Sequence, residues 1–395
     1  MREMKDSGVA WIEKIPHCWN TSKLKYLGQY INGYAFKPEE WGSKGVPIIR
    51  IQDLTGSNDN PNYFEGQIDK KYWVENGDIL ISWAATLDAF IWNKGNGWLN
   101  QHIFKAVPNR RIINYDFFFW MIKESMKNMN NDNKHGIFMQ HVTLSVFNNF
   151  TIPMPPLAEQ ERIAAFLDAE CAEIDTVLEK TRASIEEYKK LKQAVITQAV
   201  TKGIRGDRPM KDSGIEWIGD IPAEWDYTKA KNCVNIQNGS DPKTEGSIPV
   251  YGSGASSFKT CGEYKEGPSV LIGRKGATLH IPHYISTKFW NVDTAFNVYA
   301  KPNFDLKFYF YCACSFDYRF YISQTTLPSM TQTAYENMFL PLPSNDEQRV
   351  IASYLDNRCE EIDALIWKKQ ECLVEIENYK KSLIYEYVTG KKEVV

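Results

Sequence analysis

The chain has 395 residues, of which 43% are hydrophobic and 24% charged, with 46 basic and 49 acidic side chains. This length suggests two or three domains, and the composition excludes a disordered or fibrous protein. The net charge of −3 excludes bulk positive charge as an argument for nucleic-acid binding, so any such site must be local.

The eight cysteines include no Cys-x-x-Cys pair, and Cys312-Ala-Cys314 is too closely spaced for a common zinc site. They are expected to be reduced packing residues with no bound metal. The first residues lack the apolar core of a secretory signal, and no apolar run reaches the about 18 residues of a membrane span. These features predict a cytoplasmic protein that does not contact a membrane.

Two blocks of sequence occur twice. Met4–Trp19 returns as Met210–Trp225 with 10 of 16 positions identical, and Ile152–Asp175 returns as Leu340–Asp363 with 12 of 24 identical. The material between the blocks shows little similarity between the two copies. The pattern predicts a repeated frame that holds two divergent inserts. The predicted divisions are a repeat block (1–19), a first insert domain (20–151), a central helix (152–203), a second repeat block (204–225), a second insert domain (226–339) and a C-terminal helix (340–395).

The first insert contains short strand-like runs between turn residues. The predicted strands are 46–51, 77–83 and 103–107, and Phe117–Trp120 opens a short helix that should end near Lys127. The second insert follows the same order, with predicted strands 248–251, 267–276 and 291–296 and a helix at 306–314. Both inserts are therefore predicted to be α+β domains in which strands dominate.

A long helix is predicted to follow each insert. No proline or glycine interrupts residues 159–201, and apolar or neutral residues recur at heptad spacing through Leu167, Cys171 and Ile174. The second copy repeats this spacing through Leu355, Cys359 and Ile362. A helix of this length, about 63 Å at ~1.5 Å per residue, is unstable unless it buries its apolar seam.

Two arrangements can bury the seams: each helix packs on its own insert domain, or the two helices pair. The matching lengths favour an antiparallel coiled coil. The first helix leads directly into the second Met-Lys-Asp-Ser-Gly block. If the copies are equivalent, the end of the second helix should lie near the block that begins at Met4, which makes a cyclic, pseudo-twofold molecule.

The insert loops carry polar side chains that are suited to DNA. Each insert has a net charge of +2, from 14 basic and 12 acidic residues in the first and 11 and 9 in the second. Arginine suits guanine edges, glutamine suits adenine, and lysine holds phosphate. For any single one of these residues, a position in a solvated loop without a DNA contact is an equally good interpretation. His102 and His141 can equally be core histidines.

Motifs for catalysis are absent from the sequence. Asn60-Pro61-Asn62-Tyr63 lacks the second proline of the (Asp/Asn)-Pro-Pro-Tyr loop of amino-methyltransferases. No P-loop and no His-Glu-x-x-His motif occurs, so neither ATP hydrolysis nor a catalytic metal is expected.

These features together resemble the specificity (S) subunit of type I restriction-modification enzymes, over nearly the whole chain. The specific parts are the repeated Ile-Pro-x-x-Trp (15–19 and 221–225), the Glu-Gln and Leu-Asp helices (153–168 and 341–356), and Gly267–Gly276. Further similar segments of the first insert are 33–37, 48–54 and 100–104.

The resemblance implies an α+β fold in which two globular, strand-rich target recognition domains are separated by two long antiparallel helices. Each domain would read one half of a bipartite, gapped site in double-stranded DNA. The helices would set the spacing and dock two methyltransferase (M) subunits. The chain itself would be non-catalytic and hold no cofactor or metal. S-adenosylmethionine would bind the M subunits, and ATP and Mg would serve two restriction/translocase (R) subunits where these are present.

Candidate DNA contacts follow from the resemblance and the loop chemistry together. The candidates in the first domain are Arg50, Gln52, Ser82, Gln101, His102, His135 and Gln140. The candidates in the second domain are Tyr251, Ser253, Arg274, Lys275, Thr294, Ser329 and Thr331. Two other classes of function remain open: a coiled-coil scaffold that binds proteins through its inserts, and a self-sufficient nuclease or methyltransferase.

Overall fold

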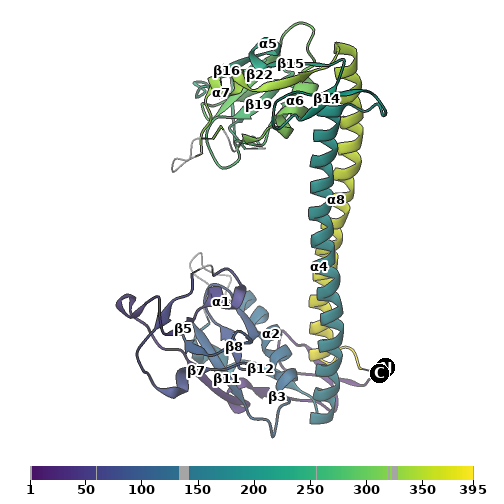
Figure 1. Cartoon of the computed structure of the whole chain (residues 1–395). Helices are drawn as coiled ribbons and strands as arrows, with labels where there is room; N and C mark the ends of the chain where they lie inside the picture. The colour runs from purple at the N-terminus through teal and green to yellow at the C-terminus, as the bar shows by residue number, and fades with distance from the viewer. Residues whose placement is uncertain are drawn as a thin grey trace. The chain divides into compact units, whose positions relative to one another are not determined.

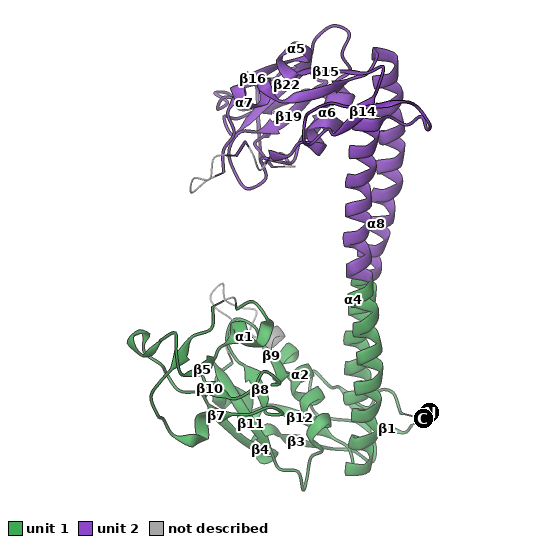
Figure 2. Ribbon diagram, in the orientation of Figure 1, with its two compact units in different colours: residues 1–180, 373–395 green, residues 181–372 purple. Residues whose placement is uncertain are grey.

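The computed structural model describes residues 2–58, 60–132, 142–254, 256–318, 321–322 and 328–394. The chain forms two compact units (Figure 2). Unit 1 contains Met1–Lys180 and Leu373–Val395, and unit 2 contains Thr181–Cys372. Each unit therefore contains one insert and parts of both long helices.

Unit 1 is built on two four-stranded sheets, with helices beside them (Figure 1). One sheet has the order β4 (Gly28–Asn32), β11 (Ile103–Pro108), β8 (Ile79–Ser82), β9 (Asp88–Ile91). The other has the order β6 (Tyr63–Phe64), β5 (Val46–Ile49), β10 (Gly97–Leu99), β7 (Trp73–Val74). Two-stranded pairs join β1 (Met4–Asp6) to β2 (Lys14–Pro16) and β3 (Asn20–Lys23) to β12 (Thr151–Met154). The helices are α1 (Ile51–Thr55), α2 (Tyr115–Asp132) and α3 (Leu144–Asn149), with short 3-10 turns at Leu24–Tyr26, Pro38–Glu40 and Lys70–Tyr72.

Unit 2 repeats this plan with different residues. Its larger sheet has the order β16 (Val234–Asn238), β22 (Ala295–Ala300), β19 (Ser269–Gly273), β20 (His283–Ile285). Its smaller sheet has the order β18 (Lys259–Cys261), β17 (Ile248–Tyr251), β21 (Trp290–Asn291). The two-stranded pairs are β13 (Met210–Asp212) with β14 (Asp220–Pro222) and β15 (Asp226–Lys229) with β23 (Phe339–Leu342), and the helices are α5 (Ala230–Cys233), α6 (Leu306–Ser315) and α7 (Gln332–Asn337).

The strand register shows which positions of the two inserts are equivalent. In unit 1, β8 pairs with β11 so that Ser82 faces Ile103. In unit 2, β19 pairs with β22 so that Gly273 faces Ala295. The smaller sheets of the two units also have the same strand pairing, because β5 is parallel to β10 and β17 is parallel to β21. The predicted α+β class and the internal repeat are therefore confirmed, although the inserts share little sequence.

The long helices are α4 (Leu157–Lys202) and α8 (Asn345–Val388), and they lie antiparallel within each unit. In unit 1 the rings of Phe166 and Tyr387 are 4.4 Å apart, and Lys380 Nζ lies 2.6 Å from Asp175 Oδ1. In unit 2 the equivalent Lys192 lies 2.6 Å from Asp363 Oδ2. The predicted antiparallel pairing is confirmed. The predicted seam residues Leu167, Cys171, Ile174, Leu355, Cys359 and Ile362 are all buried.

The end of α8 packs against the first repeat block, as the equivalence of the copies predicts. Val388 and Trp19 belong to one core in unit 1. The Lys391 Nζ donates to the Ile12 carbonyl at 2.7 Å, and the Tyr385 hydroxyl donates to the Trp11 carbonyl at 3.2 Å. Figure 1 shows the two chain ends side by side. The predicted cyclic connection is therefore present in unit 1.

A short amine-reactive crosslinker is expected to join Lys14 to Lys391, because the Lys391 ammonium donates to the Lys14 carbonyl at 2.8 Å. Mass spectrometry of the digested, crosslinked protein measures this. Lys391→Arg is the control that keeps the charge and removes the reactive amine. Absence of the crosslink in the unsubstituted chain would contradict the packing of the two chain ends.

Three predicted elements of the inserts need correction. The strand predicted at 46–51 ends at Ile49, because Asp53 accepts the Arg50 backbone N–H at 2.8 Å and begins α1 at Ile51. The run predicted at 291–296 is two strands, β21 and β22, with a turn between them. The first insert helix continues beyond Lys127 to Asp132. Within the ranges that the structure describes, no helix is long and apolar enough to cross a membrane.

Candidate nucleic-acid interface

In unit 1 the ends of β5 and β10 open into a hollow of about 330 Å³. Four of the predicted contacts line it together: Arg50, Gln52, Gln101 and His102. Its other lining residues are Trp41, Ile51, Ala85 and Asn100. Residues from four separate chain segments therefore line one hollow that is suited to polar recognition.

Local backbone bonds position these side chains. Arg50 immediately precedes α1, where the Asp53 carboxylate holds its backbone N–H. The Asn100 N–H donates to the Ile49 carbonyl at 3.1 Å, and the Ile103 N–H donates to the Asn100 carbonyl at 3.1 Å. This tight turn presents Gln101 and the exposed His102 at the hollow.

The remaining candidates of the first domain lie differently. Ser82 is fully buried, and its hydroxyl donates to the Ala84 carbonyl at 3.2 Å, so it supports the turn after β8. His135 and Gln140 lie outside the described residues, as does His141.

In unit 2 the predicted contacts gather around the ends of β17 and β19. The Arg274 and Lys275 N–H groups donate to the Thr294 carbonyl at 2.8 and 3.2 Å. Lys275 also forms an isolated antiparallel bridge with Ser329. The Thr278 hydroxyl donates to the Ser253 carbonyl at 3.0 Å, which joins the loop after β17 to the loop after β19.

The charged side chains of this cluster remain partly exposed. Lys275 Nζ lies 3.5 Å from Asp293 Oδ2, with 41% of the lysine side chain exposed. The Arg274 guanidinium lies over the Phe296 ring, 5.8 Å from its centroid. Tyr251, the last residue of β17, is half-buried. Thr331 has a structural contact, because its hydroxyl accepts the Ala334 N–H at 3.1 Å and caps α7.

The two clusters occupy equivalent places in their units. The Trp83 N–H donates to the His102 carbonyl at 3.3 Å, as the Arg274 N–H does to Thr294. The Trp83 carbonyl accepts the Val142 N–H at 2.9 Å, and the Arg274 carbonyl accepts the Met330 N–H at the same distance. Trp83 and Arg274 are therefore equivalent positions. The two units present different side chains at the same strand ends.

Two exposed aromatic residues beside these clusters were not among the predicted contacts. Trp41 is 40% exposed in unit 1, and Phe258 is 60% exposed in unit 2. The Phe258 N–H donates to the Val250 carbonyl of β17, so its ring lies next to the loop after that strand. A lone aromatic in a polar loop is the available sequence signal, but its exposure depends on tertiary packing.

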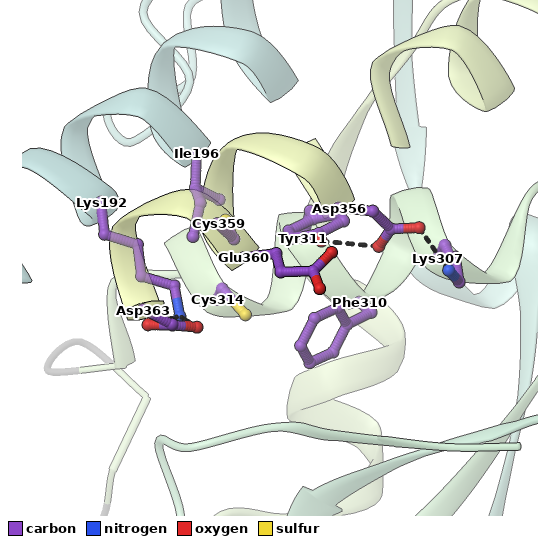
Figure 3. A pocket seen from close by; sticks show the side chains of 10 residues that line it. All are labelled: Lys192, Ile196, Lys307, Phe310, Tyr311, Cys314, Asp356, Cys359, Glu360 and Asp363. Carbon is purple, nitrogen blue, oxygen red and sulfur yellow. Dashed lines mark hydrogen bonds and ion pairs between the residues drawn. The ribbon is translucent and has the colours of Figure 1, made fainter. Parts of the chain in front are cut away.

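A second hollow, of about 580 Å³, lies between α4, α6 and α8 in unit 2 (Figure 3). Asp356 pairs with Lys307 and accepts the Tyr311 hydroxyl at 2.8 Å, which fastens α6 to α8. Burial raises the pKa of Cys314 to about 12 and also raises the pKa of Cys359, so these thiols stay protonated. In unit 1 the indole N–H of Trp120 donates to Asp168 at 2.7 Å. Asp168 is the equivalent of Asp356 in the repeat, so it links an insert helix to a long helix in the same way. The arrangement joins helices and offers no activated nucleophile.

No group of three or more His, Cys, Asp or Glu residues that could hold a metal occurs in the part of the chain that the structure describes. Burial lowers the pKa of Lys265, in unit 2, to about 8. Its ammonium donates to the Asn291 and Asn297 amide oxygens at 2.8 and 2.6 Å.

Lys265 is expected to make the stability of unit 2 depend on pH. Its pKa is lower in the folded state than the ordinary 10.5, so between about pH 8 and 10.5 the unfolded chain binds more protons. The free energy of unfolding should therefore rise with pH across this window, and the cost of burying the charge is fully present below pH 8. Urea unfolding at several pH values measures the slope.

Lys265→Met should remove this rise, whereas Lys288→Met is the matched control. Lys288 is in the same unit with 49% of its side chain exposed. If the free energy of unfolding rises equally with pH in the wild type and in Lys265→Met, Lys265 is not the cause of the pH dependence.

The family model described as "Type I restriction modification DNA specificity domain" matches residues 16–187 and 222–373. The EcoBI specificity subunit of Escherichia coli is 28% identical over 60% of this chain and 51% of its own length. The MjaVIII specificity subunit of Methanocaldococcus jannaschii is 26% identical over 57% and 51%. A putative MjaX specificity subunit from the same organism is 23% identical over 97% and 96%.

The match thus spans about half the length of the first two curated relatives. Two solved structures share the fold, each at 17% sequence identity. A chain from a structure on complex assembly and conformational transition of the type I R-M system has a TM-score of 0.74, with 96% of this chain and 99% of that chain covered. The HsdS subunit from Thermoanaerobacter tengcongensis has a TM-score of 0.51, with 96% and 98% covered.

Proposed function

We propose that this chain, which belongs to the type I restriction modification DNA specificity family, is the specificity subunit of a type I restriction-modification complex. Each insert domain is a target recognition domain that reads one half of a bipartite, gapped site in double-stranded DNA. The chain carries no catalytic step. Methylation of adenine belongs to partner subunits that bind S-adenosylmethionine, and DNA cleavage, where R subunits are present, belongs to those subunits, which use ATP and Mg.

One observation carries the proposal: the same strand ends bear different polar side chains in the two units. The loops after β5 and β8 present Arg50 and the Trp83 turn in unit 1. The equivalent loops after β17 and β19 present Ser253, Arg274 and Lys275 in unit 2. Two related scaffolds with different recognition residues suit a DNA site whose halves differ in sequence.

The repeated frame supports the proposed partners. Trp19 donates to Glu159 at 2.8 Å in unit 1, and Trp225 donates to Glu347 at 2.9 Å in unit 2. Each unit thus has the same anchor between its repeat block and a long helix. Two copies of one M subunit need two equivalent surfaces, which this frame supplies, and we assign the spacing between half-sites to the helix pair.

Reconstitution of the full chain with a methyltransferase subunit tests the function. Genome-wide mapping of methylated adenine in cells that express both should give one gapped motif. No DNA binding with the methyltransferase present would support a protein scaffold instead. Methylation or cleavage by the chain alone would support a self-sufficient enzyme.

A further inference from the structure

An exposed aromatic ring lies beside the same strand end in both units. The guanidinium of Arg50 lies over the ring of Trp41, with Cζ 4.8 Å from the centroid. Gly252 is the equivalent of Arg50, since Ile49 and Tyr251 end the equivalent strands β5 and β17. A Cβ at Gly252 would lie 3.8 Å from the Phe258 ring. Only unit 1 therefore combines the ring with an arginine.

The Arg50 guanidinium has unused donors. The Arg50 backbone N–H donates to the Asp53 carboxylate, and the guanidinium carbon lies over the Trp41 ring. Among the described residues, the guanidinium has no carboxylate or carbonyl partner. This cation–π contact restrains the guanidinium and leaves N–H donors free for a ligand with two acceptors.

The surroundings favour a base edge over a phosphate. Among the residues that the structure describes, Arg50 is the one Lys or Arg that lines this hollow, and its neighbours there include Gln52 and Gln101. A phosphate site gathers several cations or backbone N–H groups, whereas guanine offers O6 and N7 to one planar arginine.

We propose that Arg50 reads the O6 and N7 of a guanine in the first half-site, with Trp41 as the positioning residue that holds the guanidinium plane. This inference rests on the proposed function and adds one base identity and one residue to it. The second half-site has no equivalent reading, because Gly252 has no side chain at this position.

Methylated-adenine motifs of the full complex test the inference. Arg50→Ala should lower the preference for guanine at one position of one half-site by about tenfold or more, with the other half-site unchanged. Arg50→Lys should lower it similarly, because lysine keeps the charge but loses the planar fork. Trp41→Ala should also lower the preference for guanine at this position. Trp41→Phe, which keeps a ring, should restore that preference.

Arg110→Ala is the matched control. Arg110 Cζ lies 5.0 Å from the centroid of the Tyr115 ring, just beyond the end of β11 that is far from the hollow, so Arg110 makes a similar cation–π contact elsewhere in unit 1. The methylation motif of the complex that contains Arg110→Ala should match that of the wild type.

The outcomes separate the inference from the function. A gapped wild-type motif that stays unchanged in Arg50→Ala overturns the inference alone. Uniformly weaker methylation in Arg50→Ala without loss of any base preference indicates a phosphate contact and also overturns it. A wild-type complex without a gapped motif overturns the proposed function and this inference with it.

Discussion

Arg208→Met is expected to lower the free energy of unfolding of unit 2 by about 3–5 kcal/mol. The Arg208 Nη1 lies 2.7 Å from Glu347 Oε1, and the two side chains are only 11% and 10% exposed. The substitution leaves the Glu347 carboxylate buried, with the indole N–H of Trp225 as a remaining donor at 2.9 Å. A buried charge that loses its counter-ion destabilises far more than the intact pair stabilises. Hydrogen exchange of unit 2 amides during urea titration measures the loss.

Matched variants separate this effect from a general loss of charge. Arg2→Met should destabilise unit 1 in the same way, since Arg2 lies 2.6 Å from Glu159. Arg358→Met removes an exposed pair with Glu361 and should cost less than about 1 kcal/mol. Adding Glu347→Gln to Arg208→Met should recover much of the loss, because no unpaired charge then remains. Equal costs for Arg208→Met and Arg358→Met would contradict the prediction.

Tyr335→Ala is expected to destabilise unit 2 by about 3–5 kcal/mol and to disturb recognition of the second half-site. Tyr335 is fully buried, and its ring packs edge-on against Phe296 at 5.9 Å. Its hydroxyl donates to the Gly273 carbonyl at 2.7 Å, directly before Arg274. The ring and the hydroxyl therefore hold the loop that carries Arg274. Denaturation of unit 2 and the methylation motif of the complex measure the two effects.

Tyr335→Phe isolates the hydroxyl and should cost about 1–3 kcal/mol, because the buried Gly273 carbonyl loses its partner. Phe147→Ala is the matched variant in unit 1, where the fully buried Phe147 packs on Phe104, the equivalent of Phe296. Phe147→Ala should disturb recognition of the first half-site and leave recognition of the second unchanged. If Tyr335→Ala changes both half-sites equally, the assignment of one half-site to each unit is wrong.

Local patterns predicted much of the fold. The strand at Ile248–Tyr251 and a helix starting at Leu306 agree with the structure, and α4 extends only two residues before and one beyond the predicted 159–201. These elements are set by features within a few residues: apolar spacing, and prolines or glycines at their ends. Arg50 and Ile51 were predicted wrongly because the Asp53 carboxylate, a capping group three residues away, overrides the β preference of an apolar run.

The candidate site was predictable in part. Arg50, Gln52, Gln101 and His102 meet at one hollow, although they come from segments about fifty residues apart. Ser82 has the same polar character in the sequence, yet it is fully buried and supports a turn. Residue type indicates what a side chain can bind, but exposure depends on which elements cover it.

The duplication and the two long helices follow from the sequence alone, and their pairing was favoured by it, because the repeated blocks and the heptad spacing are visible along one chain. The equivalence of Trp83 and Arg274, and the contact between Trp41 and Arg50, are visible only in the folded chain. The inserts share little sequence, so their common register exists only in backbone hydrogen bonds between strands distant in the chain. Those bonds can form with almost any side chains, and for this reason they leave no pattern in the sequence.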